Sequence, residues 1–231
     1  MRLDKYIAAC TTHTRNEVKK LIKDGVVTIN GTAAKKADIN IKDSDTVCLR
    51  GKELIYREFV YLMLNKPQGY ISATEDREHR TVLDLIGEEY AQFSLFPAGR
   101  LDIDTEGLVL LTNDGAFAHE ITSPKKEVYK TYFARLDAPA EEKDIETFKA
   151  GMEFKEFTAK NAILEILDNP CEVIIKICEG KFHQVKRMCE RVGKNVIYLK
   201  RTAIGSLELD KNLALGEYRE LTEEEMMLLK K

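Results

Sequence analysis

The segment Gly99-Arg100-Leu101-Asp102-Ile103-Asp104-Thr105-Glu106-Gly107-Leu108 concentrates more polar chemistry than any other stretch of this chain. It has three carboxylates within five residues, an arginine, and a glycine on either side. The apolar run 108–111 and then Asn113-Asp114-Gly115 follow it, which predicts a strand closed by a turn. The simplest interpretation is a charged turn before that strand, since loops are rich in Asp and Gly.

Three interpretations that carry chemistry compete with the charged turn. Asp102, Asp104 and Glu106 recur at every second position, so an extended chain would point them the same way, as a magnesium site requires. The Asp-x-Asp-x-Thr order also resembles the nucleophile motif of haloacid-dehalogenase-type phosphatases, but Pro97 and Gly99 argue against the buried central strand that precedes it there. A glycosidase needs two carboxylates flanking a sugar bond, and nothing in the sequence indicates which two converge.

Three further motifs occur in order along the chain. They are Leu64-Asn65-Lys66-Pro67-Gln68-Gly69-Tyr70, Lys130-Thr131-Tyr132, and Glu179-Gly180-Lys181-Phe182-His183-Gln184-Val185-Lys186-Arg187-Met188. Together with GRLDIDTEGLVLLTNDG at 99–115, they resemble the motifs of the RsuA-like pseudouridine synthases, which isomerise uridine to pseudouridine in RNA. The resemblance extends over nearly the whole chain.

This resemblance implies catalytic roles for Asp102, Tyr132 and Lys186. A carboxylate suits the nucleophile, because it is ionised near neutrality and can form and leave a covalent adduct. By family position Lys186 is the cation that keeps Asp102 ionised, with Arg100 a second candidate, and Tyr132 is the aromatic ring that holds the base while it turns. The reaction oxidises nothing and releases no group, so we expect no cofactor.

The third motif predicts a basic helix after Gly180. Phe182, Val185 and Cys189 are expected on its apolar side, and His183, Arg187 and Arg191 on another, with Lys186 and Lys194 adding charge. A solvated basic face is the alternative. We expect substrate or RNA contacts from Lys66, Arg100, His183, Gln184 and Arg187, although the family position of Lys66 implies support of the active-site loop. His183 has no ligand-spaced partner, so no metal site is expected.

The first fifty residues have the pattern of two helices and a small sheet, with one basic helical face. Helices are expected at 2–9 and 14–24, the second with Thr14 and Glu17 as a capping box, and Asn30-Gly31 predicts a hairpin. Arg15, Lys19 and Lys23 recur every four residues, within a segment of ten basic and six acidic residues. This order resembles the S4-like RNA-binding domain, although Thr-Thr-His-Thr precedes Arg15 where Gly and Ser are usual, and the resemblance implies that the three cations contact RNA.

We therefore expect an α+β fold with two domains. Residues 1–58 would form the S4-like RNA-binding domain. Residues 59–231 would form a pseudouridine synthase catalytic domain with a central, mostly antiparallel or mixed β-sheet and an active-site cleft. Five cysteines without metal spacing, no signal-peptide core and no bilayer-length apolar run favour a cytoplasmic protein without membrane contact.

The expected substrate is ribosomal RNA, with 16S rRNA favoured, in a pre-ribosomal particle. The motif forms and the short end of the chain at Leu221-Thr222-Glu223-Glu224-Glu225 and beyond look closest to the small-subunit enzyme. The alternatives are a large-subunit (23S) rRNA pseudouridine synthase, a non-catalytic rRNA-binding assembly factor, and a metal-dependent phosphatase built on Asp102 and Asp104.

Overall fold

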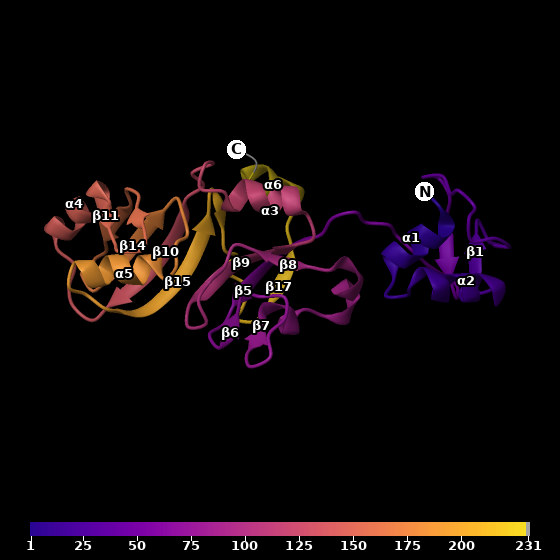
Figure 1. Cartoon of the computed structure of the whole chain (residues 1–231), viewed down its shortest axis with the longest axis horizontal. Helices are drawn as coiled ribbons and strands as arrows, with labels where there is room; N and C mark the ends of the chain where they lie inside the picture. Colours follow the sequence, from indigo (N-terminus) through magenta and orange to yellow (C-terminus); the bar gives the residue numbers. More distant parts are fainter. Residues whose placement is uncertain (230–231) are drawn as a thin grey trace. The chain divides into compact units, whose positions relative to one another are not determined.

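The computed structural model describes residues 1–229, whose contacts divide the chain into two compact units (Figure 1). The first unit comprises residues 1–60 and 87–94, and the second comprises residues 61–86 and those from 95 onward. Within the described residues, no helix is both long and apolar enough to cross a membrane.

The first unit packs two helices on a four-stranded antiparallel sheet of order β2-β1-β3-β4. Its elements are α1 (Leu3–Cys10), α2 (Arg15–Lys23), β1 (Val27–Ile29), β2 (Thr32–Ala33), β3 (Val47–Leu49), β4 (Lys52–Glu53) and the 3-10 helix η2 (Glu88–Phe93). The expected capping box of Thr14 and Glu17 is confirmed, and so is the hairpin, where Asn30 and Gly31 have φ of 51° and 79°.

The second unit is built on a nine-stranded sheet with β13-β14-β10-β15-β9-β5-β17 as its main path; β8 also pairs with β9, and β16 with β15. Its strands are β5 (Tyr61–Lys66), β8 (Phe96–Ala98), β9 (Glu106–Thr112), β10 (Lys130–Leu136), β13 (Ile163–Ile166), β14 (Glu172–Ile177), β15 (Val196–Ile204), β16 (Leu207–Glu208) and β17 (Tyr218–Glu220). The pairs are antiparallel except β15 with β9, so the expected mixed, mostly antiparallel sheet is confirmed.

Helices and two short strand pairs, β6 with β7 parallel and β11 with β12 antiparallel, complete this unit, and the expected α+β class is confirmed. The additional elements are α3 (Gly115–Thr122), α4 (Glu142–Ala150), α5 (Gln184–Arg191), α6 (Glu223–Leu229), η1 (Val82–Leu85), the pair β6 (Tyr70–Ile71) and β7 (Arg80–Thr81), and the pair β11 (Met152–Glu153) and β12 (Thr158–Ala159). Phe117 and Ile121 of α3 and Leu229 of α6 share one core cluster with Met63 of β5 and Leu110 of β9.

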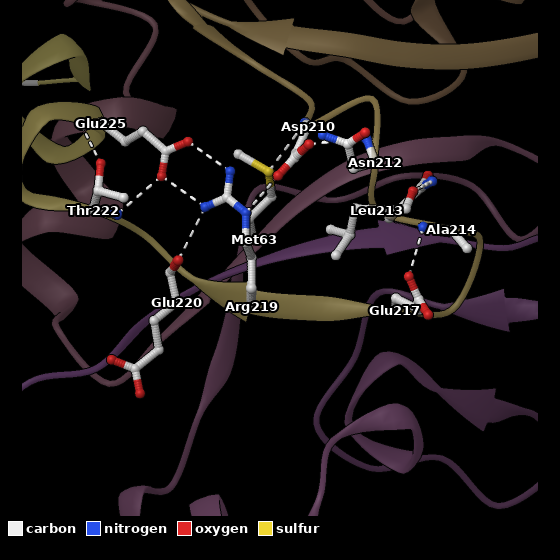
Figure 2. Close-up of polar contacts among 11 residues, drawn as sticks. Met63, Asp210, Asn212, Leu213, Ala214, Glu217, Arg219, Glu220, Thr222 and Glu225 are labelled. Carbon is white, nitrogen blue, oxygen red and sulfur yellow. Dashed lines mark hydrogen bonds and ion pairs between the residues drawn. The ribbon is translucent and has the colours of Figure 1, made fainter.

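An arginine network fixes the edge strand β17 to the C-terminal helix (Figure 2). Arg219 Nε donates to Asp210 Oδ2 at 2.7 Å, and its two terminal nitrogens each donate to a Glu225 oxygen at 2.8 Å. The pKa of the Glu225 carboxyl lies below its usual range, chiefly because the carboxyl accepts hydrogen bonds from Arg219. Because β17 pairs with β5, this network supports the strand that ends in Lys66.

The helix of the third motif begins later than the pattern predicts. It starts at Gln184, with His183 as its N-cap residue in the left-handed region (φ 51°, ψ 30°). Phe182 therefore lies before the helix and is 74% exposed, so its expected place on the apolar side is wrong. Val185 and Cys189 are buried as expected, because they face the sheet from within the helix.

Candidate active site

Asp102 lies in the loop between β8 and β9, at an open cavity of about 570 Å³. The same cavity is lined by Tyr132 from the sheet and by His183 and Lys186 from the start of α5. The loop is ordered by main-chain hydrogen bonds, from Thr105 N to Asp102 O at 3.1 Å and from Gly69 N to Ile103 O at 2.8 Å. The fold thus brings together residues from three motifs that lie up to 84 residues apart.

Lys186 lies between two carboxylates. Its Nζ is 2.6 and 2.7 Å from the oxygens of Asp104, and 3.6 Å from Asp102 Oδ2. Burial by itself raises the pKa of Asp104, but the hydrogen bond and charge of Lys186 outweigh it and hold this pKa below its usual range. Lys186 therefore forms its hydrogen bonds with Asp104, which sequence reasoning had not assigned as a partner, and reaches Asp102 through a longer ion pair.

His183 supplies a second nitrogen near the same carboxylate. Its Nε2 is 3.7 Å from Asp102 Oδ1, so Asp102 has a basic group facing each oxygen. The side chain of Asp102 is 30% exposed, which leaves it open to a ligand in the cavity. Both oxygens of Asp104 are engaged by Lys186, an arrangement that does not favour a metal shared by Asp102 and Asp104.

Tyr132 lies on β10, opposite Arg201 of β15 and next to a register shift between Thr131 and Tyr132. Tyr132 is 7% exposed, and it lines the cavity. No other described residue hydrogen-bonds its hydroxyl, so that group is free to contact a substrate. A planar ring at the wall of this cavity can stack against a nucleobase.

Lys66 is fully buried at the end of β5. Its Nζ donates to the main-chain oxygens of Thr105 at 2.8 Å, Asp102 at 3.0 Å and Pro67 at 3.1 Å, and lies 3.4 Å from that of Ile103. Burial lowers the pKa of Lys66 to about 8. Contact with RNA does not fit this burial. The geometry instead fits the loop-supporting position that the resemblance implied.

Arg201, in the middle of β15, is a residue that sequence reasoning missed. It is 2% exposed, and it donates from Nε to Leu108 O at 2.7 Å and from a terminal nitrogen to Arg100 O at 3.3 Å. It thus connects the two ends of the Asp102 loop. At Gly107 (φ 103°) an added Cβ would lie 2.2 Å from Arg201 O, so glycine is required there. A single arginine within the apolar pattern of 196–204 was the available signal.

Other residues of the third motif are engaged within the protein. Gln184 is 3% exposed and donates to Glu179 at 3.0 Å, so its expected contact with RNA does not fit its position. Arg187 pairs with Glu156 and lies over the rings of Phe154 and Phe157, at 5.0 and 4.9 Å from their centroids. This places its guanidinium on the β11–β12 hairpin.

Two further basic side chains differ in exposure. Lys194, expected to add surface charge, is 5% exposed and pairs with Asp144 at 2.7 Å. Arg100 is exposed and lines the cavity, with its main-chain oxygen bound to Arg201. Arg100 is therefore placed to meet a ligand, and Lys194 is not.

In the first unit, two of the three expected RNA-contacting residues share one shallow hollow. Arg15 and Lys19 line it together with residues from the start of the chain, Met1, Arg2, Asp4 and Lys5, of which Asp4 pairs with Arg2. Lys23 is exposed on the same helix but does not line the hollow. Close positive charges on one surface favour the binding of a polyanion.

Comparison with known proteins matches the chain to two families. Residues 60–191 match the RNA pseudouridylate synthase family, and residues 1–47 match the S4 domain. The chain is 48% identical to a Bacillus subtilis protein named uncharacterized RNA pseudouridine synthase YtzG, over 99% of this chain and 98% of that protein. It is 44% identical to ribosomal small subunit pseudouridine synthase A of Salmonella typhimurium, over 98% of both. A solved structure described as a pseudouridylate synthase superposes with a TM-score of 0.70 at 40% identity, covering 99% of each chain.

Proposed function

The chain belongs to the RNA pseudouridylate synthase family and carries an S4 domain, and on that premise we propose that it converts a uridine of 16S ribosomal RNA to pseudouridine, with Asp102 as the nucleophile. The observation that carries the proposal is the position of Asp102, which is partly exposed in the cavity with Lys186 and His183 facing its two oxygens. Membership of the RNA pseudouridylate synthase family argues against the alternative of a metal-dependent phosphatase.

In this reaction the bond between ribose C1′ and uracil N1 breaks, and a bond between C1′ and C5 replaces it, while the C5 proton is lost and N1 gains one. Asp102 forms a transient covalent bond with the substrate, and the Lys186 ammonium lies 3.6 Å from one of its oxygens. Tyr132 holds the detached base by its ring, and its hydroxyl is in reach of a proton transfer at the base. Lys66 and Arg201 hold the Asp102 loop through its main chain.

The target uridine must leave the helical stack, because its glycosidic bond is inaccessible inside a duplex. We assign residues 1–58 to anchoring the RNA, with Arg15 and Lys19 contacting phosphates, and residues 59–231 to catalysis. Such phosphate contacts position the enzyme without reading sequence. The preference for 16S rRNA draws on the relatives named ribosomal small subunit pseudouridine synthase A, and we propose a pre-ribosomal particle as the form of the substrate.

The deciding experiment is to map pseudouridines in ribosomal RNA from cells with and without this protein. We expect one 16S position to lose its modification in the deletion strain and to regain it on complementation. Loss of a 23S position instead would identify a large-subunit enzyme. No change in any rRNA would leave an RNA-binding assembly factor as the better interpretation.

Asp102→Asn and Asp104→Asn form a matched pair for the chemistry, because they remove the same charge two residues apart. We expect Asp102→Asn to abolish tritium release from RNA labelled at uracil C5, with an unchanged melting temperature. Asp104→Asn should be milder, since it frees Lys186 to approach Asp102. A more damaging Asp104→Asn would mean that Asp104 is the nucleophile.

A further inference from the structure

Phe182 is a large aromatic side chain displayed at the rim of the Asp102 cavity. It is 74% exposed and lines the cavity. Its ring stacks on that of His183, with centroids 3.7 Å apart and planes 19° apart. Since His183 Nε2 is 3.7 Å from Asp102, the stacked pair leads outward from the nucleophile, and the outer face of Phe182 meets solvent.

The loop that carries this pair is held from within. The Gln184 side chain accepts from Lys181 N at 3.0 Å and donates to Glu179 Oε1 at 3.0 Å, and that oxygen also accepts from Lys160 N at 2.8 Å. Both Gln184 and Glu179 are at most 4% exposed. His183 adopts positive φ, which is uncommon for a residue other than glycine. The hydrogen bonds thus fix the backbone of the loop, and the Phe182 ring lies against the ring of His183.

We propose that Phe182, backed by His183, is a stacking platform for the base of the nucleotide next to the target uridine. The inference rests on the proposed function. The target base belongs deeper in the cavity, beside Tyr132 and Asp102, whereas Phe182 lies at the rim, where the adjoining nucleotide leaves the site. Aromatic and histidine rings bind unstacked bases of single-stranded RNA through their faces.

The residues around Phe182 suit a nucleotide better than an apolar peptide. Lys181 precedes it, is exposed and lines the same cavity, as does Arg100. A ring next to two exposed cations offers a stacking surface for a base and charge for its phosphate. Flipping the target removes its neighbour's stacking partner, and Phe182 would replace that lost contact.

The test uses the full-length protein and a 16S fragment that contains the uridine mapped as its target. The adjoining base on each side is replaced in turn by 2-aminopurine, whose fluorescence falls when it stacks. We expect the wild-type protein to quench one of the two positions. Phe182→Tyr should retain the quenching because it keeps the ring, and Phe182→Leu should lose it while keeping an apolar side chain. Tyr129→Leu is the control, since Tyr129 is 41% exposed but does not line the cavity.

Single-turnover rates on the same RNA show whether the contact assists the reaction. At subsaturating enzyme we expect Phe182→Leu to lower the single-turnover rate about tenfold, in keeping with the loss of one aromatic–base stack. On RNA that lacks the quenched base, the wild-type rate should fall by the same factor and Phe182→Leu should cause no further loss. Melting temperatures should not change, because Phe182 is exposed.

Three outcomes would refute this role of Phe182. The first is no quenching at either position, and the second is quenching that survives in Phe182→Leu. The third is a loss of rate in Phe182→Leu that is equal on intact RNA and on RNA lacking the quenched base. The last result would point to a local structural role of Phe182. These outcomes differ from failure of the proposed function, in which the wild-type enzyme itself releases no tritium from the intact fragment.

Discussion

Lys130 is a buried lysine whose replacement should stabilise the protein. The residue is 8% exposed, and its Nζ is buried without a hydrogen-bond partner among the described residues. Burial, assisted by the positive charge of Arg201, lowers the pKa of Lys130 from 10.5 to about 8. Because an unpaired charge is costly away from water, the ammonium opposes folding at neutral pH.

The size of this effect follows from the pKa. The difference between 10.5 and about 8 corresponds to ~3 kcal/mol, since each pKa unit is worth about 1.4 kcal/mol. We expect Lys130→Met to raise the free energy of unfolding at pH 7 by up to that amount. For a chain of this size the melting temperature should then rise by up to about 10 °C.

The pH dependence of stability has a definite sign. The folded-state pKa of Lys130 lies below its unfolded value, so the unfolded chain binds more protons between pH 8 and 10.5. Wild-type stability should therefore gain from this residue as the pH rises through that window, and the penalty is fully present below pH 8. The Lys130→Met protein should lack the gain in stability that Lys130 contributes between pH 8 and 10.5.

Lys66→Met is the matched control and should have the opposite effect at pH 7. Burial lowers the pKa of Lys66 to the same value of about 8, but main-chain oxygens of the Asp102 loop accept from its ammonium. Losing the donor costs about 1–3 kcal/mol for each buried oxygen left unpaired, which in total exceeds the gain from removing the charge.

Urea denaturation of both variants and the wild type, at pH 7 and at steps from pH 8 to 10.5, gives the required free energies. A Lys130→Met protein less stable than wild type at pH 7, or one with an unchanged pH dependence, would refute the reasoning. If both substitutions changed the free energy of unfolding in the same direction, hydrogen bonds to the main chain would not distinguish these two lysines.

Three further predictions concern the loop, the RNA contacts and a buried ion pair. Arg201→Met should lower the single-turnover rate by up to about 100-fold with little change in RNA affinity, because it releases the ends of the Asp102 loop; an equal loss of affinity would contradict this role. Replacing Arg15 and Lys19 by alanine should reduce the slope of log affinity against log salt by about two, one for each phosphate contact, and an unchanged slope would identify a solvated face. Asp144→Asn should destabilise the protein by about 3–5 kcal/mol in urea denaturation, because Lys194 is left buried and unpaired, and adding Lys194→Met should restore most of that loss.

Local patterns in this sequence predicted local structure well. The Thr14 capping box and the Asn30-Gly31 hairpin form as expected, because their hydrogen bonds and turn conformations involve residues at most a few positions apart. The apolar runs around residues 62–64 and 108–111 are buried strands of the central sheet. The α+β class and the family followed from these patterns and from the order of the motifs.

The pairing of distant side chains was decided by the tertiary structure. Lys66, Lys130 and Lys186 are the same residue type in family motifs. Lys66 supports a loop, Lys130 is buried with no hydrogen-bond partner among residues 1–229, and Lys186 binds Asp104 from 82 positions away. Arg201 likewise meets the loop only because β15 lies beside β9. A sequence pattern specifies which face of an element is apolar, but the partner, burial and protonation of a charged side chain depend on which elements pack against it.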